Sequence, residues 1–133
     1  MSSSSHSSVK MTEDIKKLKS LRNTLETLEN NFPEADYPVE FESNELTALC
    51  PFTTHPDFYT LKIIYKPNKK IVELKSFKLY LERFRNLKTT HETLLNIIFE
   101  DFKALLSPGY LRVELLVNVR GGIRTSLYRE EGE

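Results

Sequence analysis

The stretch HETLLNIIFEDFKALLSPGYLRVELLVNV, residues 91–119, determines the class of fold because its apolar period changes halfway along. Residues 91–106 place leucine, isoleucine and phenylalanine at the three- and four-residue steps of a helix with a broad apolar face. Ser107-Pro108-Gly109 ends that helix, and residues 111–119 then alternate apolar and polar side chains. A helix followed by a half-buried strand predicts helices layered on a sheet.

Further strands are expected earlier in the chain. Residues 39–42 can form a short strand, and residues 58–65 are rich in β-formers. Lys66-Pro67-Asn68-Lys69-Lys70 reads as a turn, and residues 71–74 begin a return strand. Residues 58–74 are therefore predicted to form a hairpin. With the helices that follow, the order of elements predicts an α+β layer architecture.

Two more helices are predicted outside residues 91–106. Ser76 can cap a helix that ends near Asn86. An amphipathic helix is expected over residues 12–30, where Thr12 begins the pattern and acidic residues occupy the first turn. Packing, or contact between subunits, explains its apolar face, which carries Ile15, Leu18, Leu21, Leu25 and Leu28. The glycines of Arg120-Gly121-Gly122-Ile123 are expected to break the last strand.

Length and composition bound the possibilities. The 133 residues suit one domain, expected over residues 12–133, and the 19 basic and 19 acidic residues create no strong field for nucleic acid or an anionic membrane. Apolar content of 39% allows a modest core, so function is expected to depend on surfaces shared between subunits. No apolar run approaches the roughly 18 residues of a membrane span. Residues 1–11, serine-rich and without an apolar stretch, are predicted to be a disordered leader or a remnant of cloning, and the cytoplasm is the expected location.

The one cysteine lies in Leu49-Cys50-Pro51-Phe52-Thr53-Thr54-His55-Pro56-Asp57-Phe58. Two prolines and two threonines predict an ordered turn there. A lone thiol either packs in the interior or acts as a nucleophile, and composition alone favours packing. Asp57, seven residues on, could exchange protons with a substrate bound at the thiol, although that spacing alone is a weak signal.

For the other candidate residues, a purely structural role is possible as well as a functional one. His91-Glu92 begins a helix, where glutamate favours the dipole, but its carboxylate could also accept hydrogen bonds from a heterocycle. His55 and His91 with one cysteine make a poor zinc site, so no metal is expected. Lys75 and Lys78 are either solvated or a phosphate-binding patch, to which Arg120-Gly121-Gly122 could contribute. The chain has neither a P-loop nor a G-x-G-x-x-G motif.

Together these segments resemble the QueF family of nitrile reductases, from about Val39 to Tyr128. Glu73 to Tyr80 resembles the hallmark motif of that family almost residue for residue, and this is the most specific part of the match. The other segments follow in the family's order: Glu45 to Pro51 as the nucleophile segment, Pro56-Asp57-Phe58 as the proton-donor segment, Phe84-Arg85-Asn86, His91-Glu92, and Arg120 to Ile123.

The resemblance implies a reaction and a fold. Cys50 would attack the nitrile of 7-cyano-7-deazaguanine to give a thioimide, Asp57 would transfer protons, and NADPH would supply two hydrides, as part of queuosine modification of transfer RNA. The implied tunnelling fold is an antiparallel sheet with two helices on one face, assembled into rings with active sites at the interfaces. The family also implies binding residues: Val72, Glu73, Leu74, His91 and Glu92 for the deazapurine, and Lys75, Lys78, Arg120 and Gly121 for the cofactor.

The chain departs from the family pattern in three places, one of which is Arg83, which stands where a serine is common. Thr54 stands where the family usually has glycine, and residues 87–90 replace a loop that usually carries a glycine and an aromatic residue. Two alternatives stay open at this point. One is the related amidinotransferase, which adds ammonia to the nitrile on transfer RNA to form archaeosine and lacks the cofactor motif. The other is a non-catalytic tunnelling-fold binding protein in which Cys50 only packs.

Overall fold

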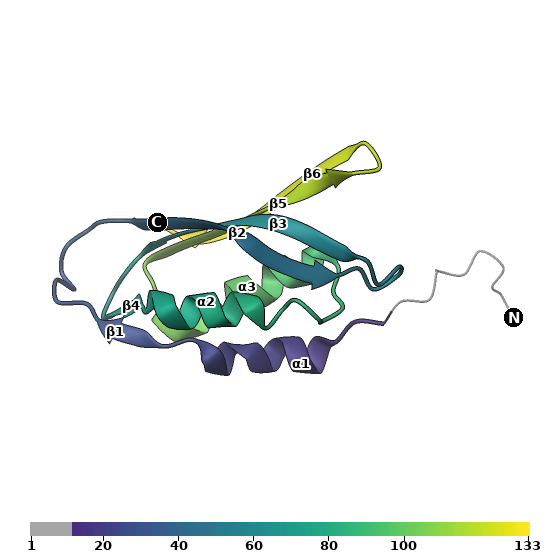
Figure 1. Ribbon diagram of the computed structural model, residues 1–133. Coiled ribbons are helices and arrows are strands. Elements are labelled where there is room, and N and C mark those ends of the chain that lie inside the picture. Colours follow the sequence, from purple (N-terminus) through teal and green to yellow (C-terminus); the bar gives the residue numbers. More distant parts are fainter. Residues whose placement is uncertain (1–11) are drawn as a thin grey trace, which may run out of the picture.

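The computed structural model describes residues 12–133, so the prediction for residues 1–11 lies outside the described part. A four-stranded antiparallel sheet in the order β2-β3-β5-β6 carries helices α2 (Leu74–Glu82) and α3 (His91–Leu106) on one face, with α1 (Ile15–Ser20) outside them (Figure 1). This arrangement confirms the predicted α+β class. The strands of this sheet are β2 (Val39–Leu49), β3 (Pro56–Lys66), β5 (Tyr110–Arg120) and β6 (Ile123–Gly132).

Helix α3 spans His91–Leu106, with the bounds that the apolar pattern predicts. The Thr90 hydroxyl caps it by accepting a hydrogen bond from the Thr93 N–H at 3.1 Å. Ser107 ends it in the left-handed conformation. Its apolar face lies on β5 and is buried at Leu94, Leu95, Ile97, Ile98, Phe99, Phe102 and Leu106.

Helix α2 spans Leu74–Glu82, so it begins earlier than predicted and ends before Asn86. Its cap is Glu73, whose carboxylate accepts hydrogen bonds from the N–H groups of Lys75 and Ser76 at 2.6 and 2.8 Å. The predicted cap, Ser76, lies inside the first turn, and its hydroxyl accepts a hydrogen bond from the Glu26 N–H. The prediction of Ser76 as cap was wrong because a side chain just before the helix satisfies the same N–H groups.

The predicted hairpin over residues 58–74 does not form. Strand β4 (Lys70–Val72) pairs instead with β1 (Thr27–Glu29) in a separate two-stranded sheet. β3 has β2 on one side and β5 on the other, so both of its edges are occupied. β4 reaches β3 through a side chain, since the Val72 N–H donates to the Tyr65 hydroxyl at 3.0 Å.

The predicted N-terminal helix over residues 12–30 is much shorter. α1 covers Ile15–Ser20, and a 3₁₀ turn, η1, continues it through Leu21–Thr24. Leu25 is extended and leads into β1, whose backbone pairs with β4. Leu28, which the helical pattern assigned to the apolar face, is 53% exposed. The helix ends before the leucine pattern does, because strand pairing satisfies the backbone hydrogen bonds of residues 27–29.

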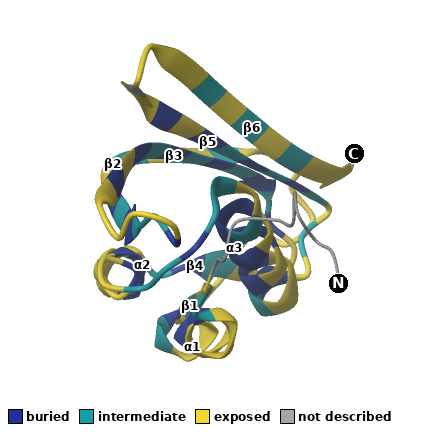
Figure 2. Ribbon diagram, turned by 90° about the vertical axis from the view of Figure 1, so that its right-hand side faces the viewer, coloured by how far each residue is buried: buried dark blue, intermediate teal, exposed yellow. Residues whose placement is uncertain are grey.

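Two strands of the main sheet differ from the prediction. β2 extends to Leu49, beyond the predicted end at residue 42, with a register shift between Ser43 and Leu46. β6 was not predicted, because the glycines at 121 and 122 were expected only to end β5. They form the turn of a hairpin, and β6 runs back along β5 as an exposed edge strand (Figure 2). None of the helices within residues 12–133 is long and apolar enough to cross a membrane.

Candidate active site

Cys50 lies at the turn that joins β2 to β3. Its N–H donates to the His55 carbonyl at 2.8 Å, and its carbonyl accepts from the Thr54 N–H at 2.9 Å. These bonds close the turn from both sides, which confirms that the segment is ordered. The thiol is half-buried, so a ligand can approach it.

Hydrogen bonds around the thiol favour its ionised form. Burial raises the pKa of Cys50, but hydrogen bonds from the Thr53 hydroxyl and from the N–H groups of Thr53 and Phe52 outweigh it. The net result is a pKa below the ordinary value of 9.0 for this thiol. A thiol with a lowered pKa and partial exposure has the properties of a nucleophile rather than of a packed side chain. Thr53 was not among the residues predicted for the site.

Asp57 faces the helices from β3, beside the Cys50 turn. It pairs with Ala48 in the β2–β3 register and is only 9% exposed. Its charge raises the pKa of the Cys50 thiol, so the two groups lie within electrostatic range of each other. The structure therefore brings together the two residues that the sequence predicted as nucleophile and proton donor. A buried carboxylate beside a thiol is suited to proton exchange with a group bound at the sulfur.

Residues 87–90 bring the start of α3 to the same end of the molecule. The Leu49 N–H donates to the Leu87 carbonyl at 2.9 Å, and the Thr89 N–H donates to the Leu49 carbonyl at 3.0 Å. Leu49 and Lys88 thus form a parallel bridge outside the main sheet. Because Cys50 follows Leu49 directly, the loop that precedes His91 is tied to the backbone beside the thiol.

His91 turns toward β3, whereas Glu92 does not. Nδ1 of His91 lies 2.8 Å from the Tyr59 hydroxyl, and the two rings meet edge to face at 5.5 Å. Glu92 is exposed and lines a shallow hollow between α1 and α3. Tyr59 was missed by the sequence reasoning, although strand alternation places it on the same face as Asp57, two residues away.

The predicted Val72-Glu73-Leu74 segment lies at the opposite end of the folded subunit from Cys50. β2 ends at the turn with Cys50, while β4 and the first turn of α2 lie near the start of β2 (Figure 1). Lys75 and Lys78 are exposed on α2. Within one chain, then, the predicted substrate-binding residues form two separate groups.

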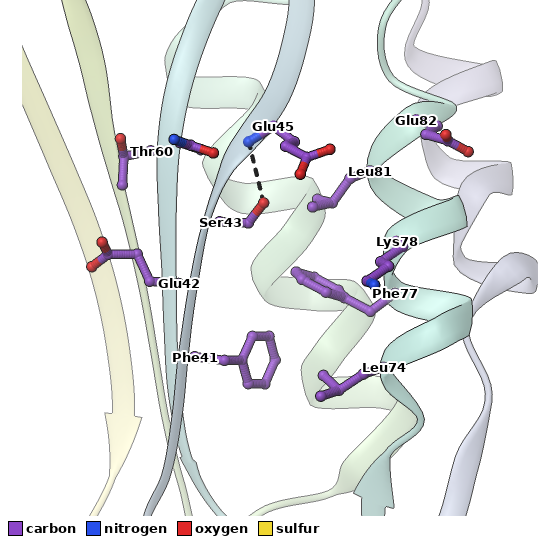
Figure 3. A pocket seen from close by; sticks show the side chains of 11 residues that line it. Phe41, Glu42, Ser43, Glu45, Thr60, Leu74, Phe77, Lys78, Leu81 and Glu82 are labelled. Atoms are coloured by element: carbon purple, nitrogen blue, oxygen red, sulfur yellow. Dashed lines mark hydrogen bonds between the residues drawn. The ribbon is translucent and has the colours of Figure 1, made fainter.

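A cleft of about 620 Å³ separates α2 from the edge strand β2 (Figure 3). Its floor is apolar, with Phe41 and Phe77 in an edge-to-face contact at 4.9 Å. Its rim carries the carboxylates of Glu45 and Glu82 and the ammonium of Lys78, whereas Glu42 points to the opposite face of β2 (Figure 3). With two negative charges and one positive charge, the cleft suits a neutral or cationic group better than phosphate.

Arg120 and Gly121 lie at the tip of the β5–β6 hairpin, away from the lysines of α2 (Figure 1). Gly121 has φ of +61° and is exposed, a conformation that glycine adopts without strain. The predicted cofactor residues are therefore not gathered by one chain either. Among the residues that the structure describes, no group of three or more histidine, cysteine, aspartate or glutamate side chains is placed to hold a metal ion.

Replacing Thr54 by glycine is expected to raise the free energy of unfolding by about 0.5–1 kcal/mol. Thr54 has φ of +62°, a conformation that strains a β-branched residue, at the position where the family pattern has glycine. Chemical denaturation measures the change. Thr54→Ala, which keeps a Cβ in the same conformation, is the matched control and should gain little. A glycine variant no more stable than the alanine variant would contradict the account.

Comparisons with known proteins bear on the family and the fold. The QueF family, described as QueF-like protein, matches residues 56–133. A Halorhodospira halophila protein named NADPH-dependent 7-cyano-7-deazaguanine reductase is 47% identical over 107 residues, which cover 80% of this chain and 91% of that protein. A Nitrosococcus oceani protein of the same name is 43% identical over 111 residues, covering 81% and 86%.

A solved structure supports the fold. The archaeosine synthase QueF-Like in its apo form is 22% identical and superposes with a TM-score of 0.67, covering 72% of this chain and 94% of that one. At this identity the likeness concerns the fold, and it confirms the predicted tunnelling architecture. The match of the family model to residues 56–133 and the 47% identity to the Halorhodospira halophila reductase show that the chain belongs to the QueF family.

Proposed function

We propose that this protein reduces the nitrile of 7-cyano-7-deazaguanine to an aminomethyl group with NADPH. The observation that carries the proposal is the half-buried Cys50 thiol with its lowered pKa, next to the buried Asp57 carboxylate. Nitrile reduction through a thioimide needs a thiolate and a proton donor at one carbon–nitrogen bond. Relatives named for this reaction are 43–47% identical to the chain.

In the proposed reaction, Asp57 accepts the proton that Cys50 loses. The thiolate attacks the nitrile carbon while Asp57 passes that proton to the nitrogen, so that a carbon–sulfur bond forms as one carbon–nitrogen π bond breaks. Two molecules of NADPH, bound one after the other, would supply one hydride each to that carbon. Asp57 passes a proton to the nitrogen for each hydride added. After the first hydride the nitrogen lone pair forms a carbon–nitrogen double bond as the carbon–sulfur bond breaks, so Cys50 leaves as the thiolate and that double bond remains to be reduced by the second hydride.

The deazapurine would be held by His91 and Glu92. The Tyr59 hydroxyl, donating to Nδ1, would fix the proton of the neutral imidazole on Nε2 and orient that ring nitrogen as a donor. The exposed Glu92 carboxylate would accept from the N–H edge of the base. These roles use the end of the molecule that also carries Cys50, so they are compatible with one bound substrate.

The remaining binding residues point to an assembly. Val72, Glu73 and Leu74 lie at the far end of the subunit, so they could line the same pocket only from a neighbouring copy. We therefore propose a homo-oligomeric ring with active sites at its interfaces. The exposed ammonium groups of Lys75 and Lys78 fit cofactor phosphates, whereas the acidic cleft beside them does not.

Arg120 and Gly121 complete the proposed cofactor contacts, and the β3–β5 register, which pairs Tyr59 with Val117, places them at the same end of the sheet as Asp57. In this proposal the free base, not transfer RNA, is the substrate, and no direct contact with nucleic acid is involved. The predicted cytoplasmic location stays a prediction.

The test is NADPH oxidation by the purified protein on adding 7-cyano-7-deazaguanine, with intact mass recorded in parallel. We expect two NADPH consumed for each aminomethyl product formed. A substrate adduct on Cys50 without oxidation, together with incorporation of ammonia, would replace the reductase by the amidinotransferase. Ligand binding with neither oxidation nor adduct would leave a non-catalytic binding protein.

A further inference from the structure

The loop before His91 is held on its outer side by two acidic residues from the start of the described chain. Oε1 of Glu13 accepts hydrogen bonds from the Thr90 N–H at 2.8 Å and from the Thr90 hydroxyl at 3.2 Å. Oδ2 of Asp14 accepts from the Lys88 N–H at 2.7 Å, and the Asp14 N–H donates to the Lys88 carbonyl at 2.9 Å. We call this group of four hydrogen bonds the acidic clasp.

Glu13 accepts the hydrogen bond from the N–H of the capping residue of α3, which the third residue of a helix usually accepts. In a capping box, a glutamate or glutamine at that position reaches back to the N–H of the capping residue. The third residue of α3 is Thr93, which bonds the Thr90 hydroxyl instead. The Thr90 N–H is satisfied by Glu13, which lies 77 positions earlier. The negative charge also lies at the positive end of the α3 dipole.

Asp14 likewise forms its hydrogen bonds with the loop rather than capping its own helix. It occupies the capping position of α1, yet its side chain makes no capping hydrogen bond there. Its carboxylate and its backbone N–H instead pair with the two backbone groups of Lys88. On its other side the same loop is bridged to Leu49, next to Cys50. The loop is thus fixed between the acidic clasp and the nucleophile strand.

The N-terminal segment has anchors of its own, away from the loop. Leu18 is fully buried. Arg22 Nε donates to the buried Asp101 carboxylate at 2.9 Å, and the Tyr80 hydroxyl donates to the other oxygen of Asp101 at 2.7 Å. Because these contacts do not involve residues 87–90, we expect α1 to stay docked when the clasp is removed.

We propose that Glu13 and Asp14 are positioning residues for the reductase site. They act through Thr90 and Lys88, holding the start of α3 so that His91 and Glu92 meet the deazapurine edge while Cys50 addresses the nitrile. This inference rests on the proposed function. It assigns to the N-terminal segment a role in binding the substrate rather than in general stability.

The test compares Glu13→Ala with Arg22→Gln. Loss of two hydrogen bonds to a carboxylate should raise KM for 7-cyano-7-deazaguanine about ten-fold and leave kcat within about two-fold. Glu13→Gln keeps the acceptor oxygen, and its KM should stay within about three-fold of wild type. Arg22→Gln removes the remote anchor, so it should lower the melting temperature without moving KM.

The proposal is overturned if Glu13→Ala keeps the wild-type KM, or if Arg22→Gln raises KM as much as Glu13→Ala does. If the wild type does not oxidise NADPH, the proposed function fails, and the same variants are compared by the rate of adduct formation on Cys50 or by the Kd of the deazapurine. An unchanged value in Glu13→Ala then overturns the positioning role. A wild type that binds no deazapurine overturns both proposals.

Discussion

Replacing Cys50 by alanine is expected to abolish nitrile reduction, with a loss of at least about a thousand-fold in kcat/KM. The nucleophile forms the bond through which the nitrile becomes a better hydride acceptor, and no other cysteine exists in the chain to replace it. NADPH oxidation and intact mass are measured together, and both oxidation and adduct should disappear. Circular dichroism should be unchanged, because the side chain is only half-buried.

The pH dependence gives an independent check on the same residue. Adduct formation needs the thiolate, so its rate should rise with pH through the pKa of Cys50, which lies below 9.0. Thr53→Ala removes the hydroxyl that favours the ionised thiol, and the rising limb should then move to higher pH. A Cys50→Ala protein that keeps full activity would mean that the thiol only packs.

Asp57→Asn is expected to lower kcat by about a hundred-fold or more. The amide keeps the size of the side chain and cannot supply protons, so each step that places a proton on the substrate nitrogen slows. Removing the negative charge should also lower the pKa of Cys50, since that charge raises it. Single-turnover measurement of adduct formation and of NADPH oxidation separates the two effects.

Asp36→Asn is the matched control for this change. Asp36 is an exposed carboxylate that pairs with Lys66 at 3.2 Å, remote from the Cys50 turn. Its loss should leave kcat and KM at their wild-type values, because a surface ion pair contributes little. Equal losses in both variants, or an Asp57→Asn enzyme with wild-type kcat, would remove Asp57 from the proton transfers.

Helix α3 and strand β5 could be predicted from sequence because local signals and tertiary packing agree there. Thr90 caps, Ser107 terminates, and the apolar period between them matches one buried face. β6 could not be predicted, because it is an exposed edge strand whose alternation is weak and whose conformation depends on pairing with β5. The N-terminal helix was predicted to be too long, because Leu25 and Leu28 continue the helical spacing of the leucines although the backbone is already extended there.

The proximity of Cys50 and Asp57 could be predicted, whereas Thr53, Tyr59 and the contacts of the N-terminal carboxylates were missed. Cys50 and Asp57 share one turn, so their proximity follows from the strands that flank it. Glu13 and Asp14 meet the loop at Thr90 and Lys88 across separations of 77 and 74 positions. A carboxylate in the first turn of a helix looks like a dipole partner, and nothing local indicates a partner so far along the chain.

The central position of β3 has a consequence for how the chain folds. β3 carries Asp57 and is flanked by β2, its neighbour in sequence, and by β5, which follows only after both large helices. Closing that long segment costs entropy before the β3–β5 ladder returns any energy, so sheet assembly should be slow relative to formation of α3. A growing chain released before residue 110 would leave one edge of β3 unpaired, and such an edge is a template for aggregation.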